Sequence, residues 1–290
     1  MKWRLRDREL LLDHAIVFGI VNVTPDSFSD GGRYLSLDAA LEQGARLLGE
    51  GADALDIGGE STRPQGATPV SVQQETERVL PVVTGLRSRF PSAILSVDTV
   101  KSEVAAAVLD AGADIINDVS GFRLDARMPD VCAAARAGIV LMHSRGGVSD
   151  MGTYAFAQYG KDVVGEVIEE LRGAVRRATD GGVARGAIAL DPGLGFAKRS
   201  EHSIAVLREL HRVVALGFPV MVGASRKRFI GELSGVATPS DRIEGTIAAN
   251  VMALAAGARI FRVHDVRPNR RALDVAWALG TGVPASEESA

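Results

Sequence analysis

One short phrase recurs along this chain and constrains its fold more than any other feature. Each copy runs from a helix-like stretch through a glycine into a short apolar segment that ends in a polar residue. The copies are EGADALDIG (50–58), DAGADIINDV (110–119), ARAGIVLMHS (135–144), ARGAIALDPG (184–193), ALGFPVMVGAS (215–225) and AAGARIFRVHD (255–265). Two further apolar segments, 15–22 and 93–98, bring the number of expected strands to eight. Repetition of this kind predicts one strand and one helix per unit.

The expected strands are rich in Val, Ile, Leu and Ala, which is typical of parallel strands buried on both faces. Eight strand–helix units close most simply into a barrel. We therefore predict an α/β fold, a single-domain (β/α)8 TIM barrel over residues 14–281. An N-terminal hairpin or extension is expected at 1–13 and a flexible C-terminal tail at 282–290. An open doubly wound sheet is the alternative, but the first strand lacks a G-x-G-x-x-G turn and no shift in composition marks a second domain.

The segments between the strands show helical periodicity. Apolar residues recur about every four positions in 163–178 and in 240–257, and Thr238 with Pro239 is a suitable N-cap and first-turn pair. Pro81 is expected to kink or shorten its helix. The glycines that precede the strands suit the position after a helix, where a positive φ is often required. They are Gly51, Gly112, Gly138, Gly186, Gly217 and Gly257.

Charge and cysteine content exclude several classes of protein. The net charge of −3 offers no basic excess for binding nucleic acid. Cys132 is the only cysteine, so no intrachain disulfide is possible, and we expect a buried structural thiol in a reducing cytoplasm. The chain has no run of about 18 apolar residues, and its charged N-terminus lacks a signal-peptide core. We therefore expect a cytoplasmic protein with no membrane partner.

Every expected strand ends in polar residues, and active sites of TIM barrels lie at the C-terminal ends of the strands. These residues are Asn22, Asp56, Asp98, Asn117, His143, Asp191, the Ser225-Arg226-Lys227 group, Arg262 and His264. The loops after the first two strands, 22–32 and 58–69, are polar, Gly-rich and longer than the usual span of about 2–6 residues. We interpret them as lids over a site, with simple solvated connections as the alternative.

The types of charge narrow the chemistry. Cations gather at the same strand ends, and they suit phosphate or carboxylate groups. They are Arg63, Arg226, Lys227, Arg228, Arg262 and His264. Asp98, Asn117 and Asp191 add acceptors and one amide, which suit a flat heterocycle with N–H donors and a carbonyl. A divalent-metal hydrolase is the competing class, but the first strand ends in IVNVT without a His-x-His, and two strand-end histidines are poor support for zinc.

Eight motifs, each at one of these strand ends, resemble the dihydropteroate synthase family across about residues 14–267. The motifs are GIVNVTPDSFSDGG (19–32), DIGGESTRP (56–64), SVDT (96–99), INDVSG (116–121), LMH (141–143), DPGLGFAK (191–198), VGASRKRF (222–229) and RVHDV (262–266). The resemblance implies a transferase of folate biosynthesis. It would join 6-hydroxymethyl-7,8-dihydropterin diphosphate to 4-aminobenzoate with Mg²⁺ as cofactor. It also implies a homodimer and competition by sulfonamides.

The resemblance also implies a role for each matching residue. The pterin would be bound by Asp98, Asn117, Met142, Asp191, Phe196, Gly223 and Lys227. The diphosphate would meet Asn22, Thr62, Arg262 and His264, with Asn22 also binding Mg²⁺. The aminobenzoate would meet Phe28, Thr62, Arg63, Pro64 and Arg228. Asp30, Arg63 and Lys227 would be catalytic, and Asp56 and His143 would have supporting roles. Some family members have a hydroxyl residue at the position of Arg228, so this arginine either pairs with the carboxylate of aminobenzoate or points away from it.

The chemistry of the substrates favours a dissociative reaction. Diphosphate is a good leaving group when cations neutralise it, and its loss leaves a pterin-methyl cation that Asp30 would stabilise. A weak aniline nucleophile then needs no strong base, and closed loops would keep water away. Methyltetrahydrofolate-dependent methyltransferases share the barrel and some strand-end residues, but they do not explain the ESTRP, SRK and RVH motifs. A non-catalytic pterin-binding paralogue is expected to lose Asp30, Thr62 and Arg63, which are all present.

Overall fold

The computed structural model describes residues 1–23, 32–60 and 70–281. Its central element is a sheet of eight parallel strands in the order β8-β7-β6-β5-β4-β3-β10-β9. A parallel bridge between Leu190 and Val220 joins the two ends of this order, so the sheet closes. The strands are β3 (Ile16–Asn22), β4 (Ala54–Gly58), β5 (Ile94–Asp98), β6 (Ile115–Asp118), β7 (Gly138–Met142), β8 (Ile188–Asp191), β9 (Met221–Val222) and β10 (Ile260–Val263). The predicted (β/α)8 barrel is confirmed.

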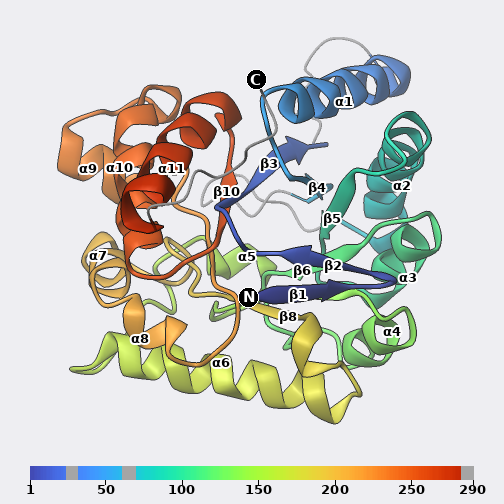
Figure 1. The fold of residues 1–290 in the computed structure, drawn as a ribbon. Coiled ribbons are helices and arrows are strands. Elements are labelled where there is room, and N and C mark those ends of the chain that lie inside the picture. The colour runs from blue at the N-terminus through green and yellow to red at the C-terminus, as the bar shows by residue number, and fades with distance from the viewer. Residues whose placement is uncertain (24–31, 61–69, 282–290) are drawn as a thin grey trace.

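Helices form a ring around this barrel (Figure 1). The longer ones are α1 (Gly32–Gly49), α2 (Val72–Arg89), α3 (Ser102–Asp110), α4 (Met128–Ala134), α6 (Val163–Asp180), α7 (Ser200–Arg208), α9 (Arg228–Ser234), α10 (Ile243–Ala255) and α11 (Val266–Thr281). The shorter ones are α5 (Val148–Met151), α8 (His211–Val214) and the 3₁₀ turns η2 (Arg185–Ala187) and η3 (Pro239–Asp241). Strand residues that face outward pack against the ring in the main apolar core, which includes Leu55, Val97, Leu141 and Leu190. Cys132 is buried in this core, and burial raises the pKa of its thiol.

Helix α2 continues through Pro81, so the expectation that this proline shortens its helix is wrong. Pro81 lies on the exposed side of the helix. Its nitrogen has no hydrogen to donate, so water can instead donate to the carbonyl one turn earlier. The helix also begins with a capping box. Gln74 N donates to Ser71 Oγ at 3.2 Å, and Ser71 N donates to Gln74 Oε1 at 3.0 Å.

The helical periodicity in 163–178 and 240–257 predicted helices α6 and α10 correctly. The start of the second one differs in detail. Thr238 caps the short turn η3 with Pro239 in its first position, and its side chain makes no capping hydrogen bond. Helix α10 begins only after this turn, at Ile243.

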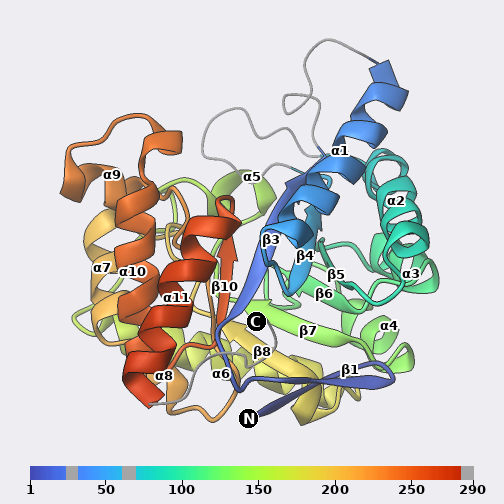
Figure 2. The same cartoon turned by 45° about the horizontal axis from the view of Figure 1, so that its top comes forward.

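A two-stranded hairpin, β1 (Lys2–Leu5) and β2 (Arg8–Leu11), covers the N-terminal end of the barrel (Figure 2). Trp3 and Leu5 are fully buried against barrel-lining residues such as Phe18 and Val140. Trp3 Nε1 donates to Ala187 O at 2.7 Å. The hairpin therefore closes the apolar interior at the end opposite to the expected active site.

The hairpin also explains two glycines that depart from prediction. Four of the six have the expected positive φ, namely Gly51, Gly112, Gly217 and Gly257, but Gly138 and Gly186 do not. A Cβ on Gly138 would lie 2.3 Å from Leu5 Cδ2, and one on Gly186 would lie 3.1 Å from Arg4 Cδ. Gly138 is therefore needed for close packing of the hairpin, whereas a side chain at Gly186 would only have to displace the flexible side chain of Arg4.

No helix among the described residues is both long enough and apolar enough to cross a membrane.

Candidate active site

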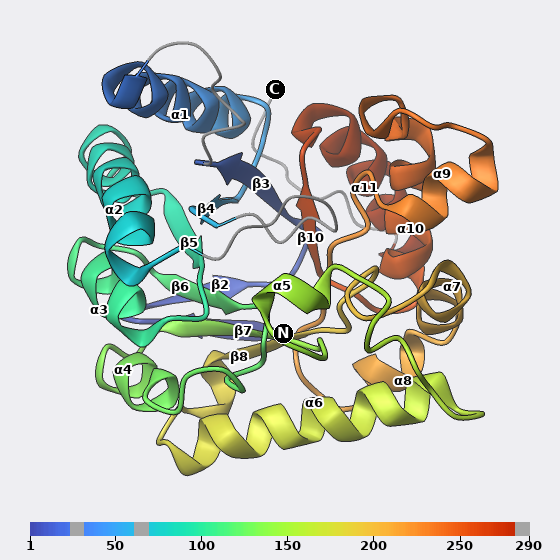
Figure 3. The same ribbon diagram turned by 180° about the vertical axis from the view of Figure 1, so that it is seen from behind.

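Figure 3 shows the barrel and its ring of helices from behind the view of Figure 1. Each of the eight strands, or the turn that follows it, carries a polar residue near its C-terminal end. At the centre of this end of the barrel lies Asp56, a carboxylate with no exposed surface. It accepts hydrogen bonds from Ser96 Oγ at 2.6 Å, from Asn117 Nδ2 at 3.2 Å and from Arg262 Nε at 2.5 Å. Asp56 therefore orients the amide of Asn117 and the guanidinium of Arg262, two groups that the sequence predicted in the site.

Asp98 lies beside Arg262, with 3.4 Å between Asp98 Oδ2 and Arg262 Nη2. Burial raises the pKa of Asp98 to about 8, although the charge of Arg262 opposes this shift. A carboxyl group with this pKa is mostly protonated at neutral pH. It can therefore both donate and accept a hydrogen bond at a ring nitrogen.

Asp191 ends β8 on the other side of the opening. Its Oδ1 accepts a hydrogen bond from Gly193 N at 2.7 Å, and burial raises its pKa to about 6. A Cβ on Gly223 would lie 3.8 Å from Asp191 Oδ2, so the absence of a side chain there leaves room beside this oxygen. The free oxygen and the adjacent space suit a donor-rich edge of a flat ring.

Lys227 and Phe196 meet above this space. The Nζ of Lys227 lies 3.9 Å from the centre of the Phe196 ring, a cation–π contact. Burial lowers the pKa of Lys227 to about 8. Phe196 also packs against a small apolar cluster that contains Met142. One wall of the site is therefore apolar and carries a single amine.

The end of β10 contributes His264. Its Nδ1 lies 2.9 Å from Ser225 Oγ, and its backbone N–H donates to the same oxygen at 3.2 Å. Ser225 therefore fixes both the backbone and the ring of His264 beside the Ser-Arg-Lys turn. This arrangement places an imidazole and Lys227 on neighbouring strand ends.

Comparison with known proteins gives the family. A sequence profile described as pterin binding enzyme matches residues 18–264 of this chain. Dihydropteroate synthase of Synechocystis sp. is 44% identical over 263 residues, which is 91% of this chain and 89% of that protein. This chain belongs to the dihydropteroate synthase family.

Other members of the family agree. The dihydropteroate synthase of Mycobacterium leprae is 46% identical over 268 residues and covers 90% of this chain and 92% of its own. The structure of Xanthomonas albilineans dihydropteroate synthase with 4-aminobenzoic acid has a TM-score of 0.89 and 44% identity, covering 98% of this chain and 99% of that one. A structure of the same enzyme holds 7,8-dihydropteroate, with a TM-score of 0.86 and 41% identity over 98% of this chain and all of that one.

Arg226 belongs to the family's Ser-Arg-Lys motif, but its charge is already paired. Its Nε and Nη2 donate to the two carboxylate oxygens of Asp265 at 3.0 and 2.7 Å. Arg226 therefore has an anionic partner within the chain, and its contact with an anionic substrate stays a prediction. The pair joins the turn after β9 to the segment that follows β10, and these two segments carry Lys227 and His264.

Arg228 lies at the rim of the site and is exposed. Its guanidinium carbon is 4.9 Å from the centre of the Tyr154 ring, and that of Arg199 is 5.2 Å from the same centre. Sequence reasoning missed Tyr154, because nothing in the local sequence connects it to either arginine. The Tyr154 ring therefore contacts two cations that are far apart in the sequence.

A cavity of about 130 Å³ lies behind the strand ends, between them and α6. It shares Met142 and His143 with the region of the site, but Asp98, Asp191 and Lys227 do not line it. Its two arginines, Arg123 and Arg177, donate to backbone carbonyl groups. We assign the substrates to the barrel opening and not to this cavity.

Several predicted residues lie outside the part of the chain that the structure describes. These are Phe28 and Asp30 of the first long loop and Thr62, Arg63 and Pro64 of the second. Asn22, at the end of β3, is described and lies near Gly58 and Asp98. Sequence reasoning also left Lys198 without a role, although it is the last residue of the DPGLGFAK motif, and the structure buries it completely.

Proposed function

We infer that this chain is a dihydropteroate synthase. It condenses 6-hydroxymethyl-7,8-dihydropterin diphosphate with 4-aminobenzoate and forms 7,8-dihydropteroate and diphosphate. The observation that supports this best is the joint presence, at one barrel opening, of Asp98, Asn117 and Asp191 with Lys227 and Arg262. The relative from Xanthomonas albilineans binds 4-aminobenzoic acid and 7,8-dihydropteroate with the same fold.

The pterin is proposed to bind between the acidic residues and the apolar wall. Its aminopyrimidinone edge carries N–H donors, which suit the unshared oxygen of Asp191. Asn117 uses an amide hydrogen on Asp56 and therefore presents its amide oxygen as an acceptor. The Nζ of Lys227 then donates to the pterin carbonyl, while Phe196 and Met142 pack against the ring.

The diphosphate is proposed to lie at the rim, where Asn22, Arg262 and His264 supply donors and positive charge. Asn22 is the residue of this group that suits Mg²⁺ as a ligand. Its Oδ1 lies beside Gly58, which has no side chain and so leaves space for an ion. Protein sites for Mg²⁺ commonly combine one or two side-chain oxygens with oxygens of a bound phosphate. We propose that Asn22 is the protein ligand. The ion, when bound, would neutralise charge on the diphosphate.

The reaction is proposed to be dissociative. The bond between the pterin methylene carbon and the diphosphate oxygen breaks first, and diphosphate leaves with the electron pair. The amine of 4-aminobenzoate then forms a C–N bond and releases one proton. Asp30 is proposed to stabilise the methylene cation, and Thr62, Arg63, Pro64 and Phe28 to surround the aminobenzoate. Arg228, held at the rim by Tyr154, is proposed to pair with the aminobenzoate carboxylate, and sulfonamides are proposed to compete there.

We also propose that the chain works as a homodimer in the cytoplasm. Helices α10 and α11 pack together and expose large apolar side chains, with Met252 65%, Val275 61% and Leu279 84% exposed. Exposed apolar groups on adjacent elements commonly mark an interface between proteins. Sedimentation analysis of the wild type and of Leu279→Glu tests this proposal. A dimeric wild type and a monomeric variant are expected, and a monomeric wild type would contradict it.

The function itself is tested by release of diphosphate from the pterin diphosphate, with and without 4-aminobenzoate and with and without Mg²⁺. We expect release that depends on aminobenzoate and is stimulated by Mg²⁺. Release that is independent of aminobenzoate, or no release at all, would contradict the proposed function. Release without any need for Mg²⁺ would contradict only the metal proposal.

A further inference from the structure

The segment that follows β8 has an unusual backbone. Residues Gly193, Gly195 and Ala197 have φ values of +66°, +75° and +45°. An alanine in this left-handed region is unfavourable, so neighbouring contacts must hold the segment in place. The same segment begins with Asp191 and contains Phe196, two residues that we assign to the pterin. What holds it therefore also determines the shape of the pterin site.

A single buried lysine ties this segment together. The side chain of Lys198 is 1% exposed. Its Nζ lies 3.1 Å from Gly193 O, 3.2 Å from Phe196 O and 2.7 Å from His143 Nδ1. Burial lowers the pKa of Lys198 to about 7. In its protonated form the amine has three donors, and here each one meets an acceptor. Two of these acceptors are backbone carbonyls of the segment itself, so the lysine closes it into a compact loop.

His143 connects this loop to the neighbouring strand. Its backbone N–H donates to Asp191 O at 2.9 Å, which continues the pairing of β7 with β8. A Cβ on Gly193 would lie 1.9 Å from His143 O, so the loop also packs directly against this backbone. Because His143 Nδ1 accepts from Lys198, the ring proton is assigned to Nε2, which lies 3.1 Å from Glu170 Oε2.

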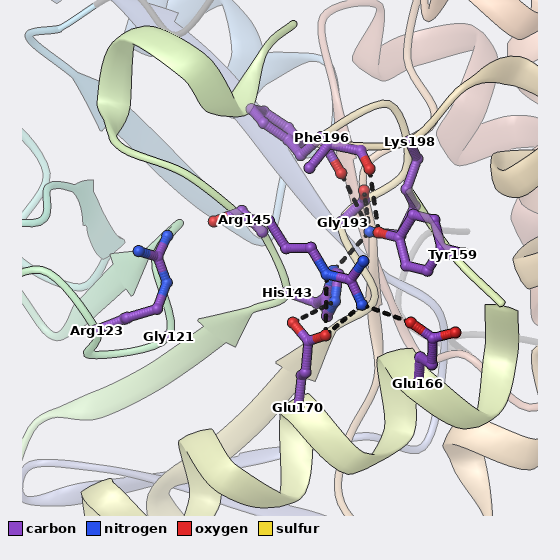
Figure 4. Close-up of polar contacts among 12 residues, drawn as sticks. Gly121, Arg123, His143, Arg145, Tyr159, Glu166, Glu170, Gly193, Phe196 and Lys198 are labelled. Atoms are coloured by element: carbon purple, nitrogen blue, oxygen red, sulfur yellow. Dashed lines mark hydrogen bonds and ion pairs between the residues drawn. The ribbon is translucent and has the colours of Figure 1, made fainter. Parts of the chain in front are cut away.

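The second half of this cluster comes from α6 and the loop before it (Figure 4). Arg145 donates to Glu170 from Nε at 2.9 Å and also from Nη2, and it stacks over the ring of Tyr159 at 4.0 Å. Tyr159 in turn donates its hydroxyl to Ala197 O at 3.1 Å. The contacts thus run from the segment through His143 and Glu170 and return to the segment through Tyr159.

The charges in this cluster are consistent with a fixed network. Burial lowers the pKa of His143 to about 4, so its ring is neutral at physiological pH and can accept from Lys198. Burial raises the pKa of Glu170, but His143 and Arg145 outweigh this and lower it to about 2. Glu170 is therefore a stable anion opposite the Nε2–H of His143.

We propose that Lys198 and His143 are positioning residues for the pterin ring. They fix the loop that presents Asp191 and Phe196 and do not touch the substrate themselves. This proposal rests on the proposed function, because it assigns the opening to a pterin. The physical reason is that a binding side chain holds its geometry only when the groups behind it are fixed. Without Lys198, the carbonyl of Phe196 loses its side-chain donor, and the Phe196 ring should shift from its contact with Lys227.

The variant Lys198→Met tests this proposal, because methionine keeps much of the length and removes all three donors. We expect the KM for the pterin diphosphate to rise by about ten-fold or more, and the KM for 4-aminobenzoate to stay within about two-fold. Binding of 6-hydroxymethyl-7,8-dihydropterin, measured by calorimetry, should weaken by a similar factor. His143→Leu should act in the same direction, whereas His143→Asn keeps an acceptor near Nδ1 and should restore most of the pterin affinity.

Arg87→Met is the matched control. Arg87 also donates to backbone carbonyls, those of Gly112, Pro91 and Ala93, but at the opposite end of the barrel, where β5 begins. It should lower Tm and leave both KM values unchanged.

Three outcomes are decisive. The positioning role is overturned if Lys198→Met and His143→Leu leave pterin affinity unchanged, or if they raise both KM values equally. It is also overturned if His143→Asn binds pterin no better than His143→Leu. If Lys198→Met does not fold, the comparison of His143→Leu with His143→Asn still tests the positioning role. A wild type that binds the dihydropterin but makes no dihydropteroate would contradict the synthase function, and the calorimetric comparison would still decide the positioning role.

Discussion

Asp56 and Arg262 are 206 residues apart in the chain, yet Asp56 Oδ2 and Arg262 Nε lie 2.5 Å apart at the centre of the barrel opening. Asp56 has no exposed surface, whereas the Arg262 side chain is 22% exposed. The buried carboxylate therefore holds the guanidinium from below and leaves part of it available at the surface of the site. A buried partner of this kind sets the direction of a charge that is used on a substrate.

This relationship predicts a loss of activity when Asp56 loses its charge. In Asp56→Asn, Arg262 loses its closest anionic partner and keeps only an uncharged amide oxygen as acceptor there, so kcat/KM for the pterin diphosphate should fall by about 10–100-fold. Ser96→Ala is the control, because it removes one neutral hydrogen bond to the same carboxylate and leaves the ion pair intact. Steady-state kinetics of both variants check the prediction, and equal effects from the two would contradict it.

The raised pKa of Asp191 predicts that the folded protein becomes more stable when this residue is replaced by an uncharged one. Its pKa is about 6 in the folded chain and near 3.8 when unfolded, so the folded state binds the proton more tightly. Its contribution to stability is complete below pH 3.8 and is lost as the pH rises through 6. At pH 8 the free energy of unfolding of Asp191→Asn should therefore exceed that of the wild type by on the order of 2 kcal/mol. Its unfolding temperature should be higher as well. The variant should also bind pterin poorly.

Thermal unfolding of this variant and the wild type at pH 4 and pH 8 provides the measurement. The difference between the two proteins should be small at pH 4 and large at pH 8. A difference that does not depend on pH would show that Asp191 is not strained by burial in the folded chain.

The N-terminal hairpin predicts a pair of compensating substitutions. Gly138→Ala would place a Cβ 2.3 Å from Leu5 Cδ2 and should destabilise the fold by about 1–3 kcal/mol through overpacking. In a Leu5→Ala background the same change should cost much less, because the clashing atom is gone. Denaturant unfolding of the two single variants and the double variant measures this coupling. Additive effects would contradict the assigned contact, and the KM values of Gly138→Ala should match those of the wild type.

The position of Arg228 predicts that its removal weakens the binding of 4-aminobenzoate and not that of the pterin. Arg228→Ala should raise the KM for 4-aminobenzoate by about five-fold and leave the pterin KM unchanged, because it removes a cation at the rim. Arg199→Ala is the matched control, since Arg199 stacks on the same Tyr154 ring from the start of α7. An unchanged aminobenzoate KM in Arg228→Ala would remove this residue from the site.

The sequence predicted the barrel because strand composition and helical period are local properties. It failed where the deciding contact is distant in sequence. Arg226 carries the same charge as Lys227, and the contact of Arg226 with Asp265, 39 residues later, could not be predicted from the local sequence. The sequence pattern predicted a helix-ending glycine at Gly138, but the hairpin at the start of the chain leaves no room for a side chain there.

The site shows the same division. Strand-end positions of Asp98, Asn117 and Asp191 could be predicted, because a parallel barrel brings its strand ends together. The burial of Lys198 could not be predicted, because the local sequence around a lysine after GFA is typical of a solvated residue. Its partner His143 lies 55 residues earlier in the chain. Burial likewise sets the raised pKa of Asp98, and no local pattern reports it.

The central claim is that the barrel opening joins a pterin diphosphate to 4-aminobenzoate. Its most direct test is mass-spectrometric measurement of 7,8-dihydropteroate from the two substrates with the wild type, Asp191→Ala and Lys227→Met. We predict product from the wild type only when both substrates are present, and a loss of about 100-fold or more in each variant. Absence of dihydropteroate with the wild type, or unchanged formation with both variants, would contradict the account.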